Sequence, residues 1–202
     1  MSVLVVGTRN SKKREEMLEI LGDLPIEVRD LTGFPDAPEV VEDGDTFEAN
    51  ARKKASELAR HLKQWVLGED SGLVVPALGG RPGVYSARYA GKQGDDAANN
   101  ARLLAELDPL PDDSRAAHYV CTAALADPAG EVRAVVEGRC HGVIVREARG
   151  TGGFGYDPLF LIPEYHQTFG ELSARVKHAL SHRGRAMAQL RPILHRLFAA
   201  TS

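Results

Sequence analysis

The chain has 202 residues, of which 43% are hydrophobic and 26% are charged, a composition that suits one globular domain with a full core. Its formal net charge of -3 argues against broad affinity for nucleic acid, but it leaves room for a local basic pocket that binds a small anion. No apolar run is long enough to span a membrane, and no signal peptide is evident. We therefore expect a single cytoplasmic domain over residues 1–202, without membrane or nucleic-acid partners.

The elements predicted in the first part of the chain alternate between strands and helices. Short apolar runs predict strands at residues 3–6 and 26–28, and the segment between them predicts a helix that ends at Gly22. Residues 31–45 contain prolines and glycines and are expected to be irregular. Thr46 is a good N-cap for a helix whose apolar residues recur at helical spacing.

The next segments are predicted to be a strand, an irregular stretch and a helix. Residues 65–67 predict a strand, which the glycine-containing segment 68–72 is expected to break before extended structure resumes at 73–75. Glycines and prolines make residues 78–94 irregular, and residues 96–107 predict a helix.

The last part of the chain predicts a hairpin, a loop and a helix. Two strand-like runs at 118–126 and 132–145 flank an Asp-Pro-Ala-Gly turn, which predicts a long hairpin. A second glycine-rich loop at 150–158 precedes a closing helix at 182–199. Strands that alternate with helices and are followed by a hairpin indicate a mixed α/β fold.

The turn between the first strand and the first helix is a candidate phosphate-binding site. The free N–H groups and the positive end of the dipole at a helix N-terminus attract anions. The turn adds short polar side chains and positive charge, from Thr8, Asn10, Ser11, Lys12 and Lys13. Neither the GxxxxGK(S/T) pattern nor the GxGxxG pattern is present. On this segment alone, helix capping and a solvated basic face are the alternative.

Two neighbouring acids, Glu69 and Asp70, follow the apolar strand and form a candidate metal site. In extended backbone they point to opposite faces, but at a strand end, where the chain turns, they converge more easily. Ser71 adds a hydroxyl, and Glu42 and Asp43 in the irregular segment offer a further ligand. Mg²⁺ binds a few carboxylate oxygens and keeps waters and substrate phosphates, and a nearby carboxylate can accept the proton of an attacking water. An acidic surface turn is the alternative.

The loop at 152–158 and a basic group near the C-terminus are candidates for binding a nucleobase. Phe154 stands between glycines, and a ring stacked on a base contributes about 1–3 kcal/mol in single-strand binders. Lys177, with His182 and Arg183 at the start of the last helix, can contact a base edge or a phosphate. A core aromatic residue at a tight turn and ordinary surface or capping side chains are the alternatives.

Taken together, these segments resemble the inosine triphosphate pyrophosphatase family, whose members hydrolyse non-canonical purine nucleoside triphosphates. Each motif is weak alone, but their order along nearly the whole chain is specific. The matching motifs lie at residues 8–13, 42–47, 50–51, 70–73, 82–88, 152–158, 171–172, 177 and 181–183.

The resemblance implies an α/β fold with two lobes, a long central sheet, a nucleotide cleft between the lobes, and a homodimer. It implies Mg²⁺-dependent conversion of ITP, dITP or XTP to the monophosphate and pyrophosphate. Carried over by position, Glu42 and Asp70 are the metal ligands, and Asp70 is also the catalytic proton acceptor. Glu69 is the third candidate ligand and has a longer arm than the aspartate usual in the family.

The resemblance also assigns the substrate contacts. The triphosphate is expected to contact Thr8, Arg9, Asn10, Ser11, Lys12 and Lys13, and Ser71 is expected to touch the substrate. The base and sugar are expected to be surrounded by Phe154, Gly155, Tyr156, Asp157, Lys177, His182 and Arg183. Adenine lacks the oxygen that hypoxanthine and xanthine carry at the purine 6-position, so it would leave buried donors of the site unpaired. Guanine also carries this oxygen, and its exclusion needs a further contact.

Two other functions fit part of the pattern. A non-catalytic nucleotide or RNA-binding module has no need for Glu42 and Asp70 beside a triphosphate loop. The septum-associated pyrophosphatase family has a similar fold and reaction, but segments 154–157 and 182–183 fit it poorly.

Overall fold

The computed structural model describes residues 3–22, 24 and 26–199. The strands are β1 (Val3–Val6), β2 (Glu27–Asp30), β3 (Trp65–Val74), β4 (Ala116–Ala126), β5 (Val132–Ile144), β6 (Phe160–Ile162) and β7 (Gln167–Thr168). The α-helices are α1 (Ser11–Leu21), α2 (Phe47–Leu62), α3 (Asp96–Leu107), α4 (Ala174–Leu180) and α5 (His182–Ala199). Short 3-10 helices occur at residues 31–33, 76–78, 83–88, 112–115 and 163–165.

Within this part of the chain the strands form a seven-stranded mixed sheet in the order β2-β1-β3-β4-β5-β6-β7. Strand β1 is parallel to β2 and β3, whereas β6 is antiparallel to β5 and β7. The chain divides into two compact units, and the long strands β3, β4 and β5 contribute residues to both. Unit 1 contains the described residues of Met1–Asp70, Cys121–Gly138 and His182–Ser202, and unit 2 contains Ser71–Val120 and Arg139–Ser181.

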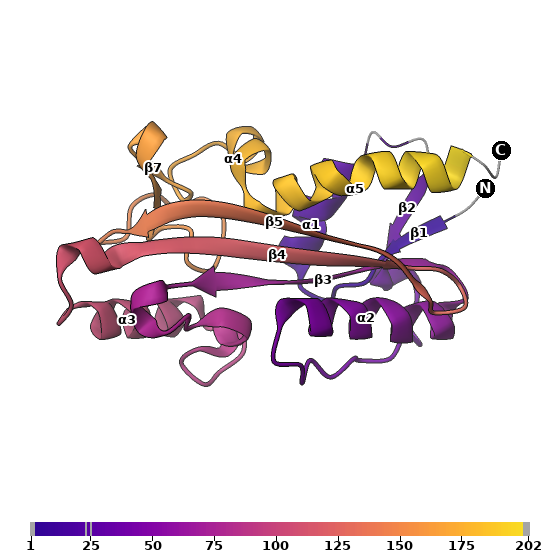
Figure 1. The fold of residues 1–202 in the computed structure, drawn as a ribbon, viewed down its shortest axis with the longest axis horizontal. Coiled ribbons are helices and arrows are strands. Elements are labelled where there is room, and N and C mark those ends of the chain that lie inside the picture. Colours follow the sequence, from indigo (N-terminus) through magenta and orange to yellow (C-terminus); the bar gives the residue numbers. More distant parts are fainter. Residues whose placement is uncertain (1–2, 23, 25, 200–202) are drawn as a thin grey trace. The chain divides into compact units, whose positions relative to one another are not determined.

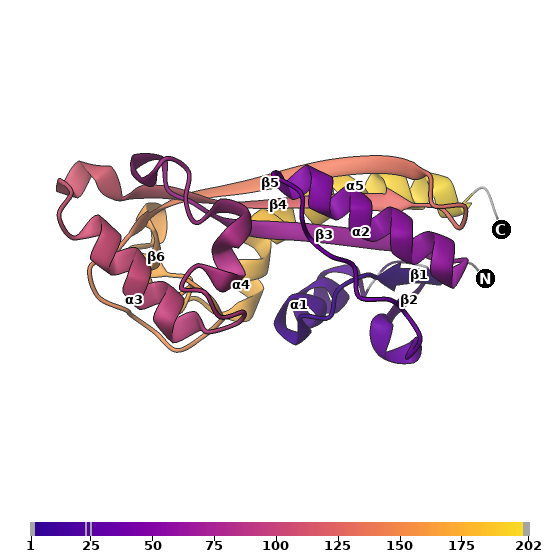
Figure 2. The ribbon, with the colours of Figure 1, turned by 90° about the horizontal axis from the view of Figure 1, so that it is seen from below.

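In unit 1, helices cover both faces of the sheet (Figure 1). Helices α1 and α5 lie on one face, where their apolar residues pack with those of the strands: Leu4, Met17, Leu21, Leu67, Cys121, Met187 and Leu190 are all buried there. Helix α2 covers the other face and runs along β3 (Figure 2). The apolar cluster on that side includes Val5, Ala51, Ala55, Leu58, Val66 and Ala124. Strands β1, β3 and β4 therefore have a buried apolar environment on each face in this unit.

Unit 2 has a single apolar core that is richer in aromatic residues. Helix α3 contributes Leu103 and Leu107, and the core also contains Leu73, Tyr119, Tyr156, Phe160 and Phe169. The rings of Phe160 and Phe169 lie 5.1 Å apart between centroids. Among the described residues, none of the helices combines the length and apolar character needed to cross a membrane.

Several predicted elements are confirmed. Thr46 caps α2, since its Oγ1 accepts a hydrogen bond from the N–H of Ala49 at 3.1 Å. The predicted helices at 96–107 and 182–199 match α3 and α5, and the long hairpin is β4 and β5. Helix α4 and strands β6 and β7 were not predicted, because they are short and carry little periodicity.

The predicted break at residues 68–72 is wrong, because β3 continues from Trp65 to Val74. Gly68 lies where helix α2 packs directly on the strand. A Cβ on Gly68 would lie 2.5 Å from the backbone of Ala51 and of Ala55. The glycine therefore allows close packing of helix on strand and does not end the strand. Because the backbone stays extended, the two acids that follow keep the alternation of a strand.

Candidate active site

The turn between β1 and α1 is tied together by its own side chains. Asn10 is the N-cap of α1, and its Oδ1 accepts from the N–H of Lys13 at 3.0 Å. Thr8 is buried, and its Oγ1 accepts from the N–H of Asn10 at 3.2 Å. The guanidinium of Arg9 donates to the carbonyl of Ala37. The capping role considered for this segment is thus confirmed for Asn10, while the phosphate contacts stay a prediction.

Lys13 reaches from α1 to β3. Its Nζ lies 3.1 Å from Glu69 Oε2, and its side chain is only 15% exposed. Burial by itself lowers the pKa of Lys13, but the charges of Glu69 and Asp70 outweigh burial and the pKa is raised. Lys13 is therefore a cation throughout the physiological range. Ser11 and Lys12, in the first turn of the same helix, are exposed.

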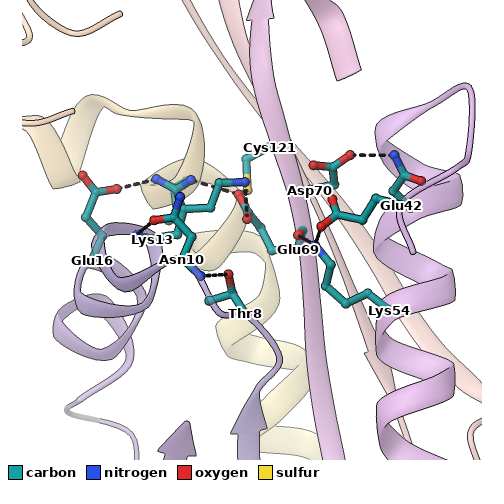
Figure 3. Close-up of polar contacts among 11 residues, drawn as sticks. Thr8, Asn10, Lys13, Glu16, Glu42, Lys54, Glu69, Asp70 and Cys121 are labelled. Atoms are coloured by element: carbon teal, nitrogen blue, oxygen red, sulfur yellow. Dashed lines mark hydrogen bonds and ion pairs between the residues drawn. The ribbon is translucent and has the colours of Figure 1, made fainter. Parts of the chain in front are cut away.

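Glu69 is the centre of a buried ionic network on the α1 and α5 face of unit 1 (Figure 3). Arg183, at the start of α5, donates to Glu69 Oε1 at 2.9 Å and also to Glu16 of α1. Cys121 Sγ lies 3.4 Å from the same Glu69 oxygen. Burial, and next the charge of Glu69, raise the pKa of the Cys121 thiol well above its ordinary value. The two carboxylates are balanced by the two cations, Arg183 and Lys13.

Asp70 points to the opposite face of β3, toward α2 (Figure 3). Its Oδ2 accepts from Asn50 Nδ2 at 3.0 Å. One turn further along α2, Lys54 Nζ lies 3.0 Å from Glu42 Oε1 and donates to the carbonyl of Glu69 at 2.9 Å. Asn50 of α2 thus holds the carboxylate of Asp70, and Lys54 of the same helix links the carboxylate of Glu42 to the backbone of β3.

The environment of Asp70 makes it a stronger base than an ordinary aspartate. Burial raises its pKa, and Lys13, Lys54 and the hydrogen bond from Asn50 offset only part of this effect. The charge of Glu42 raises the pKa of Asp70 further, so the two carboxylates are close enough to interact. A carboxylate with a raised pKa is better suited to accept a proton near neutral pH.

Glu42 and Asp70 have the chemistry that a Mg²⁺ site requires. They supply hard oxygen donors on one side of β3, and Mg²⁺ needs only a few carboxylates beside water and phosphate. Among the described residues there is no group of three or more His, Cys, Asp or Glu arranged to hold a metal, which is compatible with such a ligand-poor site. Glu69 lies on the other face, paired with Lys13 and Arg183, and does not share this position.

In unit 2, Asp157 organises the glycine-aromatic loop. Its Oδ2 lies 2.6 Å from Lys177 Nζ and accepts from the N–H of Phe154 at 2.8 Å. Tyr119 OH donates to the other oxygen, Oδ1, at 3.3 Å. Lys177 is almost fully buried, with its Nζ 4.8 Å from the centroid of the Phe154 ring. The loop therefore presents a half-buried aromatic ring beside a paired cation.

A family model described as the Ham1 family matches residues 4–193. The chain belongs to the Ham1 family. Its relatives include the "dITP/XTP pyrophosphatase" of Rhodopirellula baltica, 55% identical over 199 residues that cover 98% of this chain and 96% of that protein. A protein of the same name from Geobacter sulfurreducens is 53% identical over 191 residues, covering 95% and 96% of the two chains. The resemblance inferred from the sequence motifs is confirmed.

Solved structures of Ham1 proteins share the fold. A HAM1 protein from Coxiella burnetii superposes with a TM-score of 0.88 at 39% identity, covering 97% of this chain and all of that one. The Ham1 protein of Staphylococcus aureus gives a TM-score of 0.85 at 36% identity, covering 96% and 98%. The predicted mixed α/β fold is thereby confirmed, while the nucleotide cleft between two lobes stays a prediction.

The remaining predicted residues have different surroundings within their units. Tyr156 is a core aromatic whose hydroxyl donates to the carbonyl of Ser86 at 2.9 Å. Gly155 has φ +61, which favours glycine. Ser71 is the half-buried first residue of unit 2, and His182 is the buried first residue of α5 in unit 1.

Asn50 and Lys54 were not predicted as site residues of this Ham1 protein. Both lie on the buried side of α2, where a lysine and an asparagine interrupt an otherwise apolar pattern. Asn50 also accepts from the N–H of Gly44 at 2.8 Å, so it ties the segment that carries Glu42 to Asp70. Asparagine and lysine are mostly exposed, and lysine is almost never fully buried unless it is paired, so this interruption of the apolar pattern is the signal that could have pointed to buried partners.

Proposed function

We propose that this chain hydrolyses ITP, dITP and XTP to the corresponding monophosphate and pyrophosphate in a Mg²⁺-dependent reaction. Relatives that match it over nearly its whole length and are named dITP/XTP pyrophosphatases support this substrate class. The observation that carries the proposal is the buried Asp70 beside Glu42, with Lys13 and Lys54 near them. A module that only binds nucleotides has no need for this arrangement.

In the proposed reaction, the oxygen of a water molecule bonds to the α-phosphorus while Asp70 accepts a proton from that water. The bond from that phosphorus to the bridging oxygen breaks, and pyrophosphate leaves with the electron pair. Glu42 and Asp70 would hold Mg²⁺, which would supply neutralisation of the phosphate charge. Lys13 offers positive charge to the phosphates, since its pKa is raised and it stays protonated. Thr8 and the free N–H groups at the start of α1 complete the anion site.

Recognition of the base is assigned to the loop of unit 2. The half-buried ring of Phe154 offers a stacking surface, and Lys177 lies beside it with its charge already paired to Asp157. Pairing orients the Lys177 ammonium, a donor whose chemistry suits an oxygen at the purine 6-position. His182 and Arg183 complete the predicted set, although Arg183 is 1% exposed and bound to two carboxylates.

We also propose that the protein is a cytoplasmic homodimer without a nucleic-acid partner. The family resemblance supports the dimer, and the formal net charge of -3 is compatible with the absence of nucleic-acid binding. Light scattering during gel filtration tests the dimer. A mass of one chain, 21.9 kDa, would contradict it.

Pyrophosphate release from a panel of nucleotides, with and without Mg²⁺, tests the proposed function. Turnover of ITP, dITP and XTP should exceed that of ATP and GTP and should disappear in EDTA. Asp70→Asn should abolish turnover while the protein stays folded. Asp43→Asn is a matched control, because Asp43 is exposed and pairs with Lys53 at the surface. Binding of ITP without release of pyrophosphate would favour the non-catalytic alternative.

A further inference from the structure

Helix α3 holds the backbone of Gly155 at both of its polar atoms. The Gly155 N–H donates to Asp96 Oδ2 at 2.9 Å, and the Gly155 carbonyl accepts from Asn100 Nδ2 at 3.0 Å. Asp96 and Asn100 lie one turn apart, on the same face of the helix. The two side chains therefore fix both the position and the orientation of this residue.

Gly155 directly follows Phe154, so holding the Gly155 backbone restrains the segment that carries the Phe154 ring. The φ of +61 at Gly155 belongs to the left-handed region, which is one of many conformations open to glycine, so its backbone stays in this conformation only if its polar atoms are held. On the other side, the Phe154 N–H is held by Asp157 at 2.8 Å. Two hydrogen bonds thus attach Gly155 to α3, and a third attaches the backbone of Phe154 to Asp157.

Helix α3 is also docked in unit 2 by contacts that do not involve Gly155. The helix is anchored by the buried side chains of Leu103 and Leu107 and is capped by Asp95, which accepts from the N–H of Ala98 at 3.0 Å. The Asn100 Oδ1 atom is buried and has no hydrogen-bond partner among the described residues. The amide of Asn100 thus contributes its one hydrogen bond to the loop, and it leaves a buried acceptor unsatisfied in doing so.

We propose that Asp96 and Asn100 are positioning residues for base recognition, which act through Gly155 to hold Phe154 where it stacks on the purine of the substrate. This inference rests on the proposed function, since it concerns the same loop. Both side chains act on the backbone of Gly155 and restrict the loop, so that less conformational entropy is lost when the base binds.

Asn100→Asp tests the proposal with almost no change in shape. The variant loses the donor and places a carboxylate against the Gly155 carbonyl. We expect KM for ITP to rise about three- to tenfold, as the loss of one hydrogen bond predicts, with kcat largely unchanged. The inhibition constant of inorganic pyrophosphate, which has no base, should not change. If Asn100→Asp does not fold, Asn100→Ala takes its place.

Two further variants separate positioning from stability. Asp96→Asn keeps an acceptor oxygen for the Gly155 N–H and should retain the KM of the wild type, whereas Asp96→Ala should raise it. Asn99→Ala is the matched control on the same helix, because the Asn99 side chain binds the backbone of Ala90 at 2.7 Å and of Ala87 at 3.3 Å. It should lower Tm without raising KM for ITP.

Three results would overturn the positioning role: an unchanged KM in Asn100→Asp, a parallel change in pyrophosphate inhibition, or an equal rise of KM in Asn99→Ala. Failure of the proposed function looks different, because the wild type itself would then release no pyrophosphate from ITP. In that case the Kd of the same variants for ITP, measured by calorimetry, decides the positioning role.

Discussion

Glu69 and Asp70 are neighbours in the chain, yet their carboxylates lie on opposite faces of strand β3 (Figure 3). On one face Glu69 is neutralised by Lys13 and Arg183. On the other face Asp70 has a raised pKa and lies near Glu42. Because side chains alternate along a continuous strand, Glu69 belongs to the buried ionic network of unit 1, whereas Asp70 is available for the proposed chemistry.

This separation predicts different effects on Mg²⁺ activation. Glu42→Gln should raise the Mg²⁺ concentration for half-maximal turnover at least about tenfold, because a proposed ligand loses its charge. Glu69→Gln should leave that concentration unchanged, since Glu69 does not share the face of Asp70. Turnover of ITP as a function of Mg²⁺ measures both effects.

The control for this comparison is Asp43→Asn, which removes an exposed acid next to Glu42 in sequence. Its Mg²⁺ dependence should match that of the wild type. A shift in Glu69→Gln as large as that in Glu42→Gln would show that Glu69 is a ligand after all.

Asp70→Asn is expected to stabilise the Mg²⁺-free protein at neutral pH. Because the pKa of Asp70 is raised on folding, the folded chain holds this proton more tightly than the unfolded chain, and ionisation costs stability. The cost is absent below the ordinary pKa of an aspartate, about 3.9, and grows as pH rises through the folded pKa. The gain in Tm should therefore shrink as the pH is lowered toward that value.

Thermal unfolding in EDTA over a pH series measures this effect. Asp43→Asn should behave in the opposite way, because the hydrogen bond from Lys53 lowers the pKa of Asp43 and makes its charge stabilising. A lower Tm for Asp70→Asn than for the wild type at neutral pH would contradict the expected sign.

The features predicted correctly from the sequence depend on local signals. The cap at Thr46, the helix at 96–107 and the long hairpin each follow from a few neighbouring residues. Gly68 was misinterpreted, because its role is set by the approach of α2 rather than by its own neighbours. The partners of Arg183 lie on α1 and β3, far away in sequence, so its burial could not be predicted from the basic cluster around it.

Gly68→Ala should destabilise the protein, because the new Cβ would lie 2.5 Å from backbone atoms of Ala51 and Ala55 in α2. Backbone cannot rotate away as a side chain can, and overpacking of this kind costs about 1–3 kcal/mol. Urea unfolding measures the change. Gly33→Ala is the control, since apart from its own chain neighbours no described atom lies within 4 Å of a Cβ at that position. Equal stability of the two variants would mean that α2 can move away from β3 at no cost.

Arg183→Met should be among the most destabilising substitutions in unit 1. It leaves Glu16 and Glu69 buried without the guanidinium that both contact, and breaking a buried ion pair costs about 3–5 kcal/mol. Arg52→Met is the control, because Arg52 forms an exposed pair with Glu48 on α2, for which about 1 kcal/mol or less is expected. Urea unfolding measures the free energy of each variant.

The double variant Arg183→Met with Glu16→Gln tests whether the uncompensated charge is the cause. Glu69 keeps Lys13 as a partner at 3.1 Å, so the carboxylate left most isolated by loss of Arg183 is that of Glu16. Neutralising Glu16 should therefore recover part of the stability lost in Arg183→Met, although the same change in the wild type destabilises. If the two losses simply add, the cost arises from packing around the Arg183 side chain and not from the buried charge.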